Sequence, residues 1–404
     1  MKYIIRGKKL VTVSQLGSIE NGAMLIENEK IAAVGTLEML QKQYPAVEVF
    51  DYSEFVITPS LVDCHTHLLE FAPTSLYPVT SQTHFLAGKA ILFQALTSGI
   101  TALGEQICGH PLCDFSIEDY RESVADFPMD ISFATTSISI GFEKLAHFTS
   151  ITQSQALAQN DLKEVYLIEK MALHSDYPGE NIFINATPAN FTKETVPRAG
   201  EIIFTLEELK KIVHIFHQQG KEIGCHVAGE EGIEFALVAG FNVLHHAHGI
   251  TDIQIEKAAE KGVKIVATPM GGTHLRPNSP EEIVRLVKKN IPVSISTDSY
   301  LPPYPNVPWL PFRNQSLKGP DVLMQIAQPA MELLKSEIDE NDILALLTAN
   351  PAQILGKEHQ FGRLLPGLEA NFIVTEGIPG LEITEVERIN KVFYRGVKVI
   401  DRLV

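Results

Sequence analysis

The chain has 404 residues, which is long for one ordinary domain and suits a large α/β barrel with a smaller module. Hydrophobic residues make up 45% of it, as in a globular protein with a sizeable core. Its formal net charge of −16 argues against a nucleic acid or an anionic membrane surface as a partner.

The N-terminal region, residues 1–55, predicts a small β module. Short apolar runs alternate there with turn sequences such as Asn21-Gly22, which is the pattern of paired strands joined by tight turns. The runs are residues 3–5, 10–13, 23–26 and 30–34.

Strands alternate with helices from residue 56 to about residue 357. Thr205 and Glu208 form a capping box at the start of one helix, and Thr251 and Gly262 bracket another. Eight runs predict strands, namely residues 55–62, 101–104, 130–136, 181–186, 222–226, 242–246, 263–268 and 292–297. Eight strands that alternate with helices predict an α/β fold, a closed parallel (β/α)8 TIM-like barrel.

The C-terminal region, residues 358–404, returns to β structure. Residues 371–375 predict one strand, and residues 391–400 predict a hairpin that turns at Arg395-Gly396. We expect this region to pair with the N-terminal strands, so that both chain ends build one composite β module beside the barrel of residues 56–357.

Two histidines, His65 and His67, follow the first predicted barrel strand. Side chains at positions i and i+2 of a strand share a face, so both imidazoles can point at one spot. Neutral imidazole is the commonest metal ligand in proteins. Such a pair also occurs without a metal, so further ligands elsewhere in the chain decide the question.

Further ligand-type residues lie at the ends of other predicted strands. His226 ends the fifth strand, His246 ends the sixth, and Asp298 follows the eighth. Catalytic groups of an α/β barrel gather at the carboxyl ends of its strands. Three or four histidine and aspartate ligands with an open position are typical of a catalytic divalent-metal site.

These motifs together resemble the signatures of the amidohydrolase superfamily, in its imidazolonepropionase/cytosine-deaminase-like or prolidase-like branches. The barrel motifs are residues 62–67, 224–233, 239–246 and 296–299. The flanks at residues 18–23, 31–35 and 350–367 resemble the split β-sandwich of the family. The resemblance covers nearly the whole chain, and it implies a barrel with a composite β-sandwich.

The resemblance also implies roles for the five residues. His65, His67, His226 and Asp298 would bind a divalent metal, most simply zinc, with iron or manganese as alternatives. His246 would bind a second metal or polarise the scissile bond. Asp298 would take a proton from metal-bound water and pass it to the leaving nitrogen, because a bound ion lowers the pKa of water to about 7.

One ion is expected rather than two. Two-metal members carry a lysine at the end of strand four, and Phe183 stands there in this sequence, while Lys193 reads as a loop residue. A second site bridged in another way is the alternative. One candidate is Cys108, which is placed as in D-aminoacylases; its alternative is a buried structural thiol. The other candidate is Glu105, whose alternatives are a substrate-binding residue or an ordinary salt-bridged residue.

Glu230 is a candidate acid/base residue, because related deaminases carry a glutamate three residues after the strand-five histidine and Glu230 lies one residue further on. It reads equally well as an ordinary first-turn residue of a helix. His245 is expected in a core or second-layer role, and His248 on the face of His246. The candidates for substrate contact are loop residues, namely His110, His274, Arg276, Tyr300, Tyr304 and Trp309.

We therefore expect a hydrolase that cleaves a C–N bond of a small molecule, such as a cyclic amide or an amino group on a heterocycle, by attack of metal-bound hydroxide. An N-acyl amino acid or dipeptide hydrolase is the first alternative, and a catalytically silent scaffold is the second. Four cysteines without zinc-ribbon spacing, and the lack of a signal peptide or an apolar membrane span, predict a cytoplasmic protein. A homo-oligomer is expected.

Overall fold

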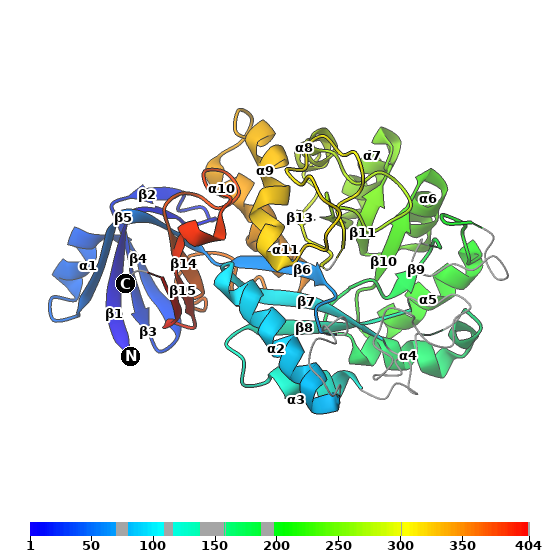
Figure 1. Ribbon diagram of the computed structural model, residues 1–404, viewed down its shortest axis with the longest axis horizontal. Coiled ribbons are helices and arrows are strands. Elements are labelled where there is room, and N and C mark those ends of the chain that lie inside the picture. The colour runs from blue at the N-terminus through cyan, green and yellow to red at the C-terminus, as the bar shows by residue number, and fades with distance from the viewer. Residues whose placement is uncertain are drawn as a thin grey trace.

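The computed structural model describes residues 1–69, 80–108, 116–137, 157, 159–186, 198–299 and 301–402, apart from the side chains of Ser81 and Cys108. A barrel and a separate β-sheet lie side by side in it, and both chain ends lie in the sheet (Figure 1). No helix among these residues is long and apolar enough to cross a membrane.

Both ends of the chain contribute strands to one eight-stranded sheet, which confirms the composite β module. Its order is β16-β15-β14-β5-β1-β3-β4, and β2 pairs with β1. The strands are β1 (Lys2–Val11), β2 (Ser18–Glu20), β3 (Gly22–Glu27), β4 (Lys30–Thr36), β5 (Val49–Pro59), β14 (Phe372–Thr375), β15 (Ile389–Tyr394) and β16 (Val397–Asp401). Tyr3, Met24, Phe372 and Phe393 share one apolar cluster, while α1 (Leu37–Gln43) buries Leu40 in another.

Eight parallel strands among the described residues form the barrel. They are β6 (Leu61–Thr66), β7 (Ile100–Cys108), β8 (Asp130–Thr136), β9 (Ile182–Phe183), β10 (Gly224–Ala228), β11 (Val243–His248), β12 (Lys264–Ala267) and β13 (Val293–Ile295). Strands β6 to β8 make one parallel sheet, and β9 to β13 make another. Parallel bridges join the two sheets at both seams, Thr66 to Ser299 and Ser137 to Ile182, so the predicted (β/α)8 architecture is confirmed.

The predicted bounds of the first barrel strand, residues 55–62, are wrong. Residues up to Pro59 belong to β5, which pairs with β14 in the composite sheet, and the barrel strand starts at Leu61. Residues 56–69 are buried throughout. The apolar pattern therefore runs through both strands without a break and does not show where one ends.

The helices lie outside the barrel strands (Figure 1). Their bounds are α2 (Ser81–Thr97), α3 (Ile117–Val124), α4 (Val165–His174), α5 (Leu206–Gln218), α6 (Glu230–Ala239), α7 (Asp252–Lys261), α8 (Pro280–Lys288), α9 (Leu323–Leu334), α10 (Glu340–Leu344) and α11 (Ala349–Ile354). The predicted caps are confirmed: Thr205 and Glu208 form a capping box, and Gly262 ends α7 at a φ of 67°.

Candidate metal centre

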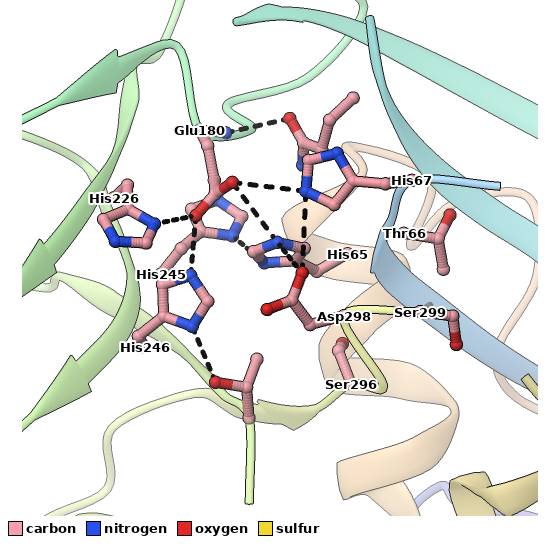
Figure 2. A network of polar contacts seen from close by, with 12 residues as sticks. His65, Thr66, His67, Glu180, His226, His245, His246, Ser296, Asp298 and Ser299 are labelled. Atoms are coloured by element: carbon pink, nitrogen blue, oxygen red, sulfur yellow. Dashed lines mark hydrogen bonds and ion pairs between the residues drawn. The ribbon is translucent and has the colours of Figure 1, made fainter. Parts of the chain in front are cut away.

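Five side chains that the sequence selects come together at one place. His65 lies in β6, His67 follows that strand, His226 lies in β10, His246 lies in β11 and Asp298 follows β13. All five are buried, with exposed fractions between 0 and 6%. They point inward from four separate strands toward a common point (Figure 2). The barrel therefore gathers the predicted ligand-type residues.

A sixth residue, Glu180, lies between them and was not selected from the sequence. It comes from the segment that leads into β9, and its side chain is 1% exposed. Its Oε2 lies 3.4 Å from Nε2 of both His65 and His67. Its Oε1 lies 2.6 Å from Nδ1 of His226 and from Nε2 of His246. The carboxylate thus divides the four histidines into two pairs, as Figure 2 shows.

Close packing fixes the backbone at Glu180. Its N–H donates to Oε1 of Gln106 at 3.0 Å, and its carbonyl oxygen accepts from Thr136 at 2.8 Å. A Cβ at Gly179 would lie 2.4 Å from the same Gln106 oxygen, and one at Gly224 would lie 2.1 Å from the carbonyl oxygen of Gly179. Only glycine fits at these two positions, so the segment rests directly against its neighbours and aims Glu180 into the barrel.

The first group of ligand atoms has the dimensions of a tetrahedral metal site. The Nε2 atoms of His65 and His67 lie 3.3 and 3.5 Å from Asp298 Oδ1, and 3.4 Å from Glu180 Oε2. A tetrahedral ion with bonds of about 2.0–2.1 Å holds its ligands roughly 3.3 Å apart. His65 Nε2 is buried without a hydrogen-bond partner in the part of the chain that the structure describes. These four residues fit a divalent ion.

The second group points to another cation. The Thr268 hydroxyl donates its one proton to the carbonyl oxygen of Gly271 at 2.8 Å. In its 2.7 Å contact with Nδ1 of His246 the hydroxyl oxygen is therefore the acceptor, and Nδ1 is the donor. Burial, and then the charge of His226, lower the pKa of His246 to about 4, so that ring is neutral. Its Nε2 lone pair then faces the Glu180 carboxylate. Two electron pairs at 2.6 Å require a proton or a metal ion between them.

Charge balance supports the same conclusion. Burial raises the pKa of Glu180, but the neighbouring rings of His65, His226 and His246 outweigh it and hold that pKa well below its usual range. Burial lowers the pKa of His65, but the carboxylates of Glu180 and Asp298 raise it to about 10. The cluster therefore gathers positive charge around two ionised carboxylates. A divalent ion replaces such protons when it binds.

Glu105, an alternative ligand, and Phe183, at the position of the missing lysine, both have other contacts. Both oxygens of Glu105 accept backbone N–H groups just after β6, from Leu68 at 2.8 Å and from Leu69 at 2.9 Å. Glu105 therefore holds the loop beside His67. Phe183, at the position expected for a bridging lysine, stacks its ring on His226 with centroids 4.2 Å apart.

Glu230, selected from the sequence as a catalytic residue, is not among the side chains that the described part of the chain gathers at the cluster. It is exposed at the first position of α6, where a carboxylate is favoured by the helix dipole. The ordinary first-turn interpretation is therefore the observed one. The glutamate that lies among the histidines is Glu180. Four further candidates lie outside the described residues or have undescribed side chains: Cys108, His110, Lys193 and Tyr300.

Two further candidates, His248 and Arg276, are engaged within the protein. His248 is fully buried, with Nδ1 2.7 Å from Thr273 and Nε2 3.1 Å from Thr268, so both ring nitrogens are occupied. Arg276 lies over the ring of Trp309 at 4.7 Å, in a cation–π contact. The structure therefore gives these two residues internal partners instead of a direct place among the ligands.

Gly272 brings the loop after β12 against the ligands, and its replacement should impair the site. Its φ is +111°, and a Cβ there would lie 2.3 Å from Asp298 Oδ2 and 2.4 Å from His246 Cε1. We expect Gly272→Ala to lower kcat about 100-fold, because displacing a catalytic group by about 1 Å has that effect. Steady-state kinetics measure this effect.

Gly262→Ala is the matched control for that variant. Its φ is also positive, +67°, but no atom of the described residues lies within 4 Å of the added Cβ. It should lower stability by roughly 1 kcal/mol and leave kcat unchanged. Equal kcat values for the two variants would show that the Gly272 loop does not position the ligands.

Known proteins share sequence and fold with this chain. A model of the amidohydrolase family matches residues 56–399, and a model of the bacterial imidazolonepropionase-like composite domain matches residues 22–46. The imidazolonepropionase of Shouchella clausii (strain KSM-K16) is 24% identical over 415 residues, covering 96% of this chain and 88% of that protein. The 5-methylthioadenosine/S-adenosylhomocysteine deaminase of Desulforudis audaxviator (strain MP104C) is 22% identical over 402 residues, covering 93% and 85%. The structure of a Xaa-Pro dipeptidase with bound methionine has a TM-score of 0.72 at 15% identity and covers 98% of this chain and 99% of that one, a likeness of fold.

Proposed function

The chain belongs to the amidohydrolase family, and from that premise we propose that it hydrolyses a C–N bond of a small molecule at a two-ion centre bridged by Glu180. The observation that carries this proposal is the position of the Glu180 carboxylate. One of its oxygens faces His65 and His67, and the other faces His226 and His246. A carboxylate shared in this way is suited to bridge two cations.

Each ion would have its own ligands. His65, His67 and Asp298 would hold the first, His226 and His246 the second, with Glu180 common to both. The convergent donors among the described residues form two overlapping groups, one of His65, His67 and Asp298 and the other of His65, Glu180 and His246. His65 is common to both groups, and His226 joins the second through its 2.6 Å contact with Glu180. When bound, divalent ions lower the pKa of water to about 7 and polarise a carbonyl group.

Asp298 is the proton carrier in this proposal. Its Oδ1 faces His65 and His67, while its Oδ2 lies toward the Gly272 loop. A carboxylate beside the attacking water accepts its proton and returns it to the leaving nitrogen. The imidazole Nδ1 of His246 is bound to Thr268, which fixes the ring so that Nε2 remains directed inward.

We propose two ions in place of the single ion expected from the sequence. That expectation came from the missing strand-four lysine, and Glu180 supplies a carboxylate without it. The second group needs a small adjustment, because its 2.6 Å contacts are about 0.7 Å shorter than the roughly 3.3 Å between tetrahedral ligands. We propose zinc, with manganese or iron as alternatives, since nitrogen and carboxylate donors suit all three.

A cyclic amide or an aminated heterocycle is the first substrate class that we propose. The imidazolonepropionase and deaminase relatives span more than nine-tenths of the chain and support it. An N-acyl amino acid or dipeptide is the second class. The Glu180 bridge favours this second class. A one-ion heterocycle hydrolase is preferred from the sequence because the strand-four lysine is missing, and a centre bridged by Glu180 does not need that lysine. We also propose that the protein is cytoplasmic and forms a homo-oligomer.

A substrate panel tests this function. The zinc-loaded and manganese-loaded protein would be assayed with cyclic amides, amino-substituted heterocycles, N-acyl amino acids and dipeptides, with detection of ammonia, ring-opened acid and free amino acid. We expect turnover of one class, lost on treatment with a chelator and restored by the metal. Turnover that survives complete metal removal would contradict the mechanism, and no turnover in any class would favour the silent scaffold.

A further inference from the structure

His245 is a fully buried histidine that touches a candidate ligand. Its ring centroid lies 4.8 Å from that of His65. Its Nδ1 lies 2.8 Å from Nδ1 of His65, and its Nε2 lies 3.0 Å from the carbonyl oxygen of Pro178. Figure 2 shows the ring beside His65. Because both ring nitrogens are used inside the protein, neither remains for an ion or a substrate.

The contact with Pro178 determines which ring nitrogens of His245 and His65 carry a proton. A carbonyl oxygen only accepts, so Nε2 of His245 carries a proton and donates it. In the neutral ring Nδ1 then only accepts, and His65 must donate from its own Nδ1. Once His65 gives up its other proton to bind a metal, its lone pair is therefore on Nε2. That is the atom that faces the carboxylates of Asp298 at 3.3 Å and Glu180 at 3.4 Å.

The same side chain also connects two ligand-bearing segments. Pro178 lies two residues before Glu180, and His65 lies on β6. The hydrogen bonds therefore run from β6 through His245 on β11 to the segment that carries Glu180. Loss of His245 would release both ends together.

We propose that His245 is a positioning residue, which fixes His65 in its metal-binding tautomer and holds the Glu180 segment against it. This inference rests on the proposed metal centre. Second-layer partners of metal-bound histidines change metal affinity by about 10–100-fold when they are replaced. The expected consequence of losing His245 is therefore weaker ion binding, separate from any loss of folding.

Two substitutions test the inference. His245→Phe keeps a ring but removes both hydrogen bonds, whereas His245→Asn keeps an oxygen near the Nδ1 position that accepts from His65. Protein stripped of metal would be titrated with Zn²⁺ in competition with a chromophoric chelator. We expect His245→Phe to bind Zn²⁺ about 10–100-fold more weakly than the wild type, and His245→Asn to recover most of that loss. The visible absorption spectrum of the Co²⁺ form should change in the Phe variant and return toward the wild type in the Asn variant.

His84→Phe is the matched control, since His84 is also buried and hydrogen-bonded, to Tyr120 at 3.3 Å, but lies on α2. It should alter stability and leave Zn²⁺ affinity unchanged.

Wild-type affinity in His245→Phe would overturn the positioning role and leave the metal centre intact. An equally weak His245→Asn would overturn the proton assignment. A wild-type protein that binds no Zn²⁺ would overturn both the inference and the proposed function. Should His245→Phe fail to fold, His245→Gln, which retains only the donor toward Pro178, is expected to show the same loss of affinity.

Discussion

Glu180→Gln is expected to lower kcat on the order of 1,000-fold and to reduce the bound metal to one ion or fewer per chain. The neutral amide removes the charge shared by the two histidine pairs and presents an N–H₂ group to one of them. Charge stabilisation by a bound metal is worth several kcal/mol in the transition state, and about 4 kcal/mol corresponds to a factor of 1,000. Steady-state kinetics and elemental analysis of the same preparation measure both effects.

Glu230→Gln is the matched control for this substitution. Its carboxylate is exposed at the start of α6, so both kcat and metal content should stay within about twofold of the wild type. A large loss in Glu230→Gln together with normal activity in Glu180→Gln would reverse our assignment. It would restore Glu230 as the glutamate of the active site.

Asp298→Asn should lower kcat by about 100- to 10,000-fold while the protein keeps much of its metal. The substitution removes the proton acceptor, and general acid–base groups contribute rate factors of that size. The remaining amide oxygen can still face His65 and His67, where Asp298 Oδ1 now lies 3.3 and 3.5 Å from the two Nε2 atoms. KM should change little, since the loss affects the chemical step.

Metal content separates the two roles of Asp298. An inactive Asp298→Asn enzyme that retains its ions supports the proton-carrier role. If that variant loses all its metal, the residue acts chiefly as a ligand. Full activity with full metal content would show that another group carries the proton.

The regular features of the chain were predictable from its sequence. The barrel order, the composite sheet and the helix caps follow from periodicity and local hydrogen-bonding chemistry, which act over a few residues. The five candidate ligands were found because each of them lies at or just after the end of a predicted strand. That rule comes from the parallel barrel itself.

Glu180 was missed because it precedes its strand. Only two residues, Ile182 and Phe183, form β9, so the carboxylate before them reaches the level of His226 and His246. Its position depends on close contacts at Gly179 and Gly224 with segments distant in sequence. Local patterns do not reveal such contacts. A glutamate next to the Pro178-Gly179 pair was the one available signal, since glycine permits close approach of backbones.

The neighbouring histidines of β11 also departed from simple strand alternation. Residues 246 and 247 have left-handed backbone conformations, with φ of 69° at His246 and 47° at Ala247. This allows consecutive side chains, His245 and His246, to both contact His65, with centroids 4.8 and 5.0 Å away. Non-glycine residues in such conformations cost about 1–3 kcal/mol each, and they concentrate at functional sites. Asp298, with a φ of 53°, shares this feature.

Anomalous diffraction from zinc-loaded crystals tests the central claim most directly. Data collected on both sides of the zinc absorption edge would count the ions and place them against Glu180. We predict two peaks roughly 3.5–4 Å apart, one beside His65, His67 and Asp298 and the other beside His226 and His246, with the Glu180 carboxylate between them. A single peak that Glu180 does not contact would contradict the two-ion centre.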